Sequence, residues 1–181
     1  MTAILRHLPF REEADEVSCG LERVPIKPYQ IIVWVSLTAR PVVELPPTAP
    51  RLLALLDTGH NHNFSLQDRH LAQWAGLDAA LPRVGRIREG GRDLPLHAAN
   101  VWLHPNLRGK RDAFSGAPPL LLPLDQGIAV YPGGSSFPRL PLLGLRALVR
   151  NKLHVALDPE RRVVHLRTSD WRARLAQWLL A

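Results

Sequence analysis

The chain has 181 residues, 46% of them hydrophobic, which suffices to bury one core and makes a single domain the default. Its net charge is +7, but the basic residues are nearly all scattered Arg, which argues against a specific nucleic-acid-binding stripe. Cys19 is the only cysteine, so an intramolecular disulfide is excluded. With no N-terminal signal and no long apolar span in the sequence, we expect a soluble, cytoplasmic protein that does not enter a membrane.

The expected elements are mainly strands, separated by loops rich in Pro and Gly. Residues 1–28 are mixed and charged and are expected to form an N-terminal arm, with the main domain at 29–168. A helix is expected at 65–74, and Ser169 is a plausible N-cap for a C-terminal helix at 169–181. Strands are expected at 30–37, 51–56, 84–88, 93–97, 100–103, 120–123, 127–131 and in two alternating segments of 153–166.

Asp57-Thr58-Gly59 ends the apolar run 52–56 and opens onto the polar residues 60–63. A carboxylate at the end of a buried strand costs desolvation energy, which a fold seldom accepts without a use for the charge. A three-residue motif is weak evidence alone, because it also occurs in ordinary strand-ending turns. The residues that surround the motif therefore decide whether it indicates a catalytic site or an ordinary turn.

A second motif follows at 140–148, where apolar residues and Gly144 lead into a short helix-like segment, before the two strands around the Asp158-Pro159-Glu160-Arg161 turn. In the order and context of these two motifs, residues 29–168 resemble the retropepsin-like aspartic proteases, the single-lobed relatives of pepsin. The resemblance implies a mostly β fold, a closed barrel or sandwich with one or two short helices and a C-terminal helix.

That resemblance implies an aspartic endopeptidase with Asp57, Thr58 and Gly59 as its catalytic motif. Two carboxylates that share one proton can activate water and protonate a carbonyl, because two charges about 3 Å apart cannot both ionise. The chain has one such motif, so a homodimer would supply Asp57 twice. Thr58 would bond across the dimer axis and Gly59 would bring its N–H to Asp57. No cofactor or metal is implied.

The turn 89–92 lies between two expected strands and contains Gly90 and Gly91. By the resemblance, this hairpin is the flap, and its two glycines would close over a peptide or protein substrate and bind its extended backbone.

Three alternatives remain. Asp125 also precedes a glycine by two residues, as in a two-lobed enzyme, but Gln126 replaces Thr and a turn with a solvated Asp is favoured. His60 departs from the family pattern after Gly59, where it would either bond to the catalytic pair or point to solvent, and such a chain could be an inactive dimerisation or peptide-binding module. His60, His62 and His70 could instead bind a metal.

Overall fold

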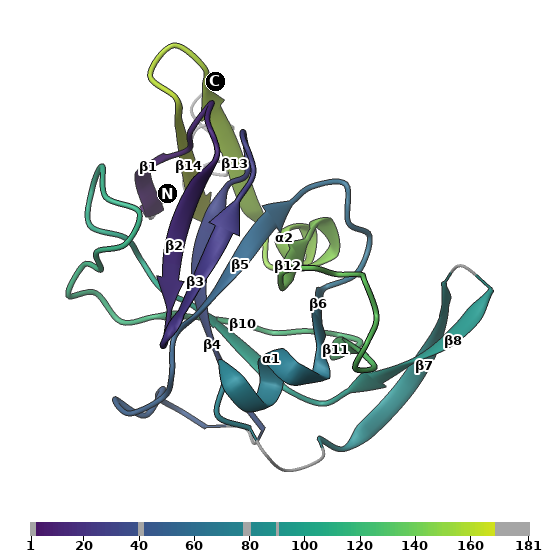
Figure 1. Cartoon of the computed structure of the whole chain (residues 1–181). Helices are drawn as coiled ribbons and strands as arrows, with labels where there is room; N and C mark the ends of the chain where they lie inside the picture. The colour runs from purple at the N-terminus through teal and green to yellow at the C-terminus, as the bar shows by residue number, and fades with distance from the viewer. Residues whose placement is uncertain (1–2, 40–41, 78–80, 90, 169–181) are drawn as a thin grey trace, which may run out of the picture.

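The computed structural model describes residues 3–39, 42–77, 81–89 and 91–168, and within them the fold is mostly β, with fourteen strands and two short helices. The largest unit is a nine-stranded sheet (Figure 1). Its strands, in spatial order, are β10 (Leu120–Leu122), β9 (Asn100–Leu103), β4 (Ile32–Thr38), β5 (Leu52–Asp57), β12 (Leu142–Gly144), β6 (Phe64–Gln67), β11 (Ile128–Tyr131), β8 (Arg92–His97) and β7 (Arg83–Glu89).

The described sheet begins at β10 and ends at β7, so the closed barrel expected from the sequence is not formed there. Its last two strands form a hairpin that projects away from the rest of the molecule (Figure 1). This hairpin and the other expected strands lie close to their predicted positions, and Asp57 ends β5 as expected.

The centre of the sheet has an inserted strand. β5 and β6 follow each other in the sequence, yet β12 lies between them, parallel to β5 and antiparallel to β6. Gly144 is the register partner of Asp57. The helix α2 (Leu145–Arg150) begins directly after it. Asp57 therefore lies beside the junction of β12 and α2.

The helix expected at 65–74 is only partly correct. Residues 64–67 form β6, and the helix α1 is limited to Asp68–Gln73. All four residues of β6 are buried, because β12 and β11 pair with its two edges and the sheet is covered there. Pairing with strands from later in the chain overrides the local helical pattern.

Residues 3–26 form three strands that are built into the fold. β1 (Ala3–Pro9) pairs with β14 (Val163–Thr168), which also pairs with β13 (Leu153–Asp158), while β2 (Asp15–Cys19) and β3 (Glu22–Ile26) form a hairpin. The side chains of Ile4, Leu5 and Leu8 belong to the main core cluster. The C-terminal helix expected at 169–181 lies outside the described residues.

One core cluster extends from these strands into the large sheet. Its fully buried large side chains are Leu5, Leu8, Ile32, Leu52, Leu53, Phe64, Leu66, Leu103, Leu122, Ile128, Leu143 and Leu166. A smaller cluster of Leu94, Leu96, Ala129 and Tyr131 packs the base of the β7–β8 hairpin against β11. Neither of the two helices described is both long and apolar enough to cross a membrane.

His104 is buried in this core in a neutral form. The Ser36 hydroxyl donates its proton to the carbonyl of Pro50, so its oxygen accepts a hydrogen bond from His104 Nε2, 2.8 Å away. Burial, with the nearby charge of Arg51, lowers the pKa of His104 to about 4.

This burial predicts a pH-dependent stability. Below its ordinary pKa of 6.5, His104 binds a proton in the unfolded chain but not in the folded one until about 4, so the free energy of unfolding falls as the pH drops through this window. Between pH 7 and 5, His104 should account for roughly 2 kcal/mol of that loss. Urea unfolding should show a smaller pH dependence for His104→Gln than for the matched variant of exposed His154, His154→Gln. Equal pH dependences would contradict the assignment.

Candidate functional site

The loop 58–63 connects β5 to β6 and carries the candidate catalytic motif. Asp57 is half-buried, and its Oδ1 accepts a hydrogen bond of 2.9 Å from the N–H of Gly59. A Cβ on Gly59 would lie 3.3 Å from that oxygen, so glycine allows this close approach. The N–H of His60 donates to the carbonyl of Asp57. The backbone thus fixes the carboxylate, while Thr58 is exposed beside it.

Gly144 is where this loop crosses the end of β12. A Cβ there would lie 2.0 Å from the carbonyl oxygen of His62 and 2.7 Å from that of His60, distances that no side chain tolerates. The N–H of Gly144 donates to Asn63, and the N–H of Leu145 donates to His60. The apolar-apolar-Gly motif therefore provides the space for the Asp57 loop.

His60 neither bonds to Asp57 nor points to solvent, the two possibilities raised by the sequence. Its side chain is buried, and its Nε2 is hydrogen-bonded to Ser65 Oγ at 2.7 Å. Burial, followed by the proximity of His62, lowers the pKa of His60, although Asp57 and Glu89 oppose this shift. His60 therefore holds the loop against β6 rather than occupying the surface near Asp57.

The end of the β7–β8 hairpin reaches the same loop. Glu89 accepts a hydrogen bond from the Tyr131 hydroxyl, and its other carboxylate oxygen lies 3.8 Å from His62 Nε2. Burial and Glu89 raise the pKa of Tyr131. Gly91 has a φ of +79° and open space around it, as a hairpin tip requires. Gly90 lies outside the described residues.

The loop 132–138 forms another wall of the site. Asp68 accepts a hydrogen bond from the Gly133 N–H, and the side chain of Gln67 donates to the carbonyl of Ser135. These contacts attach the loop to the start of α1. They place Phe137, which is 46% exposed, against the rings of His60 and Tyr131, with centroid distances of 6.3 and 5.4 Å.

Of the three histidines considered for a metal, His60 and His62 pack edge to face with ring centroids 5.2 Å apart, whereas His70 is engaged elsewhere. The backbone N–H of Gln67 donates to His70 Nδ1, and the His70 ring stacks on Trp74. Burial, followed by the charge of Arg69, lowers the pKa of His70 to about 4. In the described parts of the chain, no group of three or more His, Cys, Asp or Glu residues is arranged to hold a metal ion.

Asp125, the internal rival of Asp57, lies in a turn but is not simply solvated. Arg146, Arg150 and Asn63 all contact its carboxylate, with N–O distances between 2.6 and 3.0 Å. The hydrogen bond from Arg146 above all holds its pKa well below the usual range. Gly127 has a φ of +71°, and a Cβ there would lie 2.2 Å from the carbonyl of His97. The Asp-Gln-Gly sequence is therefore a structural turn.

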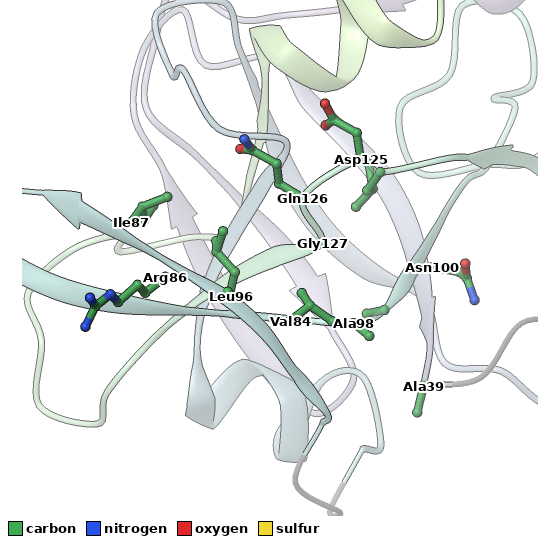
Figure 2. Close-up of a pocket in the computed structure, with 13 residues that line it drawn as sticks. Ala39, Val84, Arg86, Ile87, Leu96, Ala98, Asn100, Asp125, Gln126 and Gly127 are labelled. Atoms are coloured by element: carbon green, nitrogen blue, oxygen red, sulfur yellow. The ribbon is translucent and has the colours of Figure 1, made fainter.

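A cavity of about 490 Å³ lies at the base of the hairpin (Figure 2). Figure 2 shows the Asp125 carboxylate directed away from Val84 and Leu96, toward α2. The cavity lining combines apolar side chains with polar ones such as Arg86, Asn100 and Gln126, and Asp57 does not contribute to it. The cavity is thus separate from the Asp57 loop.

The chain matches no protein-family model, no curated protein and no solved structure. The function of the protein is therefore inferred from its residues and their geometry.

Several residues that contact His60 or His62, directly or through one another, were not predicted from the sequence. These residues are Ser65, Glu89, Tyr131 and Phe137. Glu89 adjoins the glycine turn and Phe137 follows a loop rich in Gly and Ser, but neither position carries a motif. They reach the site through pairing of β6 with β11 and of β11 with β8, which a local pattern does not reveal.

The crossing at Gly144 predicts a strong destabilisation by Gly144→Ala. The added Cβ would meet backbone atoms of His60 and His62 that cannot rotate away, so the free energy of unfolding should fall by about 3 kcal/mol. Gly116→Ala is the matched control, since its Cβ would meet nothing within 4 Å and should change stability by about 0.5 kcal/mol at most. Chemical unfolding measures both, and a similar small effect at the two positions would refute the close crossing.

Proposed function

We propose that this protein is an aspartic endopeptidase with a retropepsin-like fold, and that two Asp57 carboxylates of a homodimer form its catalytic pair. One observation carries the proposal. Asp57 ends a buried strand beside Gly144, is oriented by a backbone N–H, and forms no salt bridge within the described residues. Asp125, in contrast, is neutralised by two arginines. Of the two Asp-x-Gly carboxylates, Asp57 is thus the one available for chemistry.

The proposed reaction is hydrolysis of a peptide bond. One carboxylate accepts a proton from water as the water oxygen attacks the carbonyl carbon, and the other, protonated, donates to the carbonyl oxygen. Collapse of the tetrahedral intermediate breaks the C–N bond as the proton taken from water passes to the leaving nitrogen, and one hydroxyl of the intermediate returns its proton to the second carboxylate. One Asp57 cannot perform both roles at once, so the mechanism requires the second copy.

The surface next to Asp57 supports a dimer. Leu145 and Val149 lie one turn apart on α2, which begins beside Asp57, and they are 39% and 64% exposed. A second copy that approached Asp57 would cover these two side chains and remove them from water. Thr58, exposed next to Asp57, would then lie near the two-fold axis.

The β7–β8 hairpin would act as the flap. Its contact with His62 and Tyr131 through Glu89 brings its end to the Asp57 loop. Substrate would bind between the hairpin and this loop as an extended peptide. We place the activity in the cytoplasm, because Cys19 is a buried free thiol and no disulfide is possible within the chain.

Asp57→Asn tests the chemistry. The amide has the size of the carboxylate but cannot accept the proton of water, so cleavage of a peptide mixture should fall at least about a thousandfold while the circular dichroism spectrum and Tm stay close to the wild type. Asp125→Asn is a control for the loss of a carboxylate: it should weaken the fold by removing ion pairs, yet retain cleavage. Undiminished cleavage by the Asp57 variant would assign the activity to other residues, and an intact protein that cleaves nothing would favour a binding module.

Val149→Glu tests the dimer. A charge introduced into the covered surface should weaken dimerisation at least about tenfold, which sedimentation velocity measures, and should lower cleavage in proportion to the loss of dimer. Val43→Glu, at a position 97% exposed in another part of the molecule, should change neither property. A wild-type protein that stays monomeric with and without peptide would contradict the shared pair of carboxylates.

A further inference from the structure

Glu89 is a carboxylate at the end of β7, next to the tip of the hairpin. Its side chain is 39% exposed, between the buried base of the hairpin and solvent. Tyr131 donates one hydrogen bond to it, and His62 lies 3.8 Å from its other oxygen. A carboxylate offers about four acceptor positions, so Glu89 retains acceptor capacity beyond these two contacts.

Tyr131, which bonds to this carboxylate, is one of two aromatic residues that pack together here. The Tyr131 ring packs edge-on against Phe137, and the Phe137 ring is the more exposed of the two. Aromatic faces attract ammonium and guanidinium groups, and their carbons pack against the apolar stem of Lys or Arg. A carboxylate next to aromatic rings therefore suits a substrate side chain that is long and ends in a cation.

We propose that Glu89 is a specificity-determining residue, which selects substrates with Lys or Arg close to the bond that is cleaved. The proposal rests on the proposed endopeptidase function. The stem of the substrate side chain lies along Phe137, and its cationic group binds the Glu89 carboxylate. Asp57, on the same loop as His62, adds negative potential on this side, which favours a cation and disfavours an acidic side chain.

The first experiment compares cleavage sites in a peptide mixture by mass spectrometry, for the wild type, Glu89→Gln and Asp93→Asn. Lys and Arg should be enriched at one position within about three residues of the cleaved bond. In matched peptides, kcat/KM for Lys over norleucine should fall about tenfold in Glu89→Gln. Asp93 lies on the same hairpin and pairs with Arg86, so its variant should keep the preference. Equal losses for the Lys and norleucine peptides in Glu89→Gln would overturn the proposal.

The second experiment separates this proposal from the proposed function. Fluorescence anisotropy measures the binding of the same two peptides to Asp57→Asn protein, with and without Glu89→Gln, so no cleavage is needed. The Lys peptide should bind about tenfold more tightly than the norleucine peptide, and Glu89→Gln should remove the difference. If the wild-type protein shows no cleavage but this difference in Kd is found, the endopeptidase function is contradicted and the cation subsite is retained. No difference in Kd, whether both peptides bind or neither does, overturns the subsite.

Discussion

The site depends on one backbone crossing. β12 is inserted between two strands that are consecutive in the sequence, so the loop that joins them must pass over the end of β12. The carbonyls of His60 and His62 approach the chain so closely at Gly144 that a Cβ does not fit. The His60 carbonyl also accepts the N–H of Leu145, the first residue of α2. Asp57 and α2 are therefore positioned relative to each other by main-chain atoms, which vary less in position than side chains.

Asp57 and Asp125 each lie two residues before a glycine, yet their surroundings give the two carboxylates different roles. In a chain with 23 basic residues, an exposed carboxylate readily finds an arginine, and Asp125 is held by two. Asp57 instead interacts with the dipole of a backbone N–H, in a loop whose buried histidine resists protonation. A site that must present a carboxylate to a substrate needs such an arrangement, because an arginine on the same oxygens would block approach and stabilise the ionised form alone.

The elements that could be predicted from the sequence are those that depend on residues close together in the chain. An apolar run that ends at Asp57 and the alternation around Gly90 and Gly91 suffice to place a strand end and a hairpin. Residues 65–67 were predicted as helix because the covering strands β11 and β12 come more than 60 residues later. Glu89 and Phe137 could not be predicted as site residues for the same reason, because their neighbours are fixed by pairing between distant segments. The expectation of a closed barrel came from the resemblance, and the described sheet is open.

The pairing of β1 with β14 has a consequence for synthesis of the chain. Leu5 and Leu8 are synthesised well before residues 163–167, with which their strand pairs. Their side chains are fully buried only after residues 163–167 have been made, and β5 pairs with β12 only after residues 142–144 have been made. Contacts of such sequence separation are formed slowly, since loop closure must precede them. The Asp57 site is therefore incomplete in a nascent chain until β12, at residues 142–144, has been made.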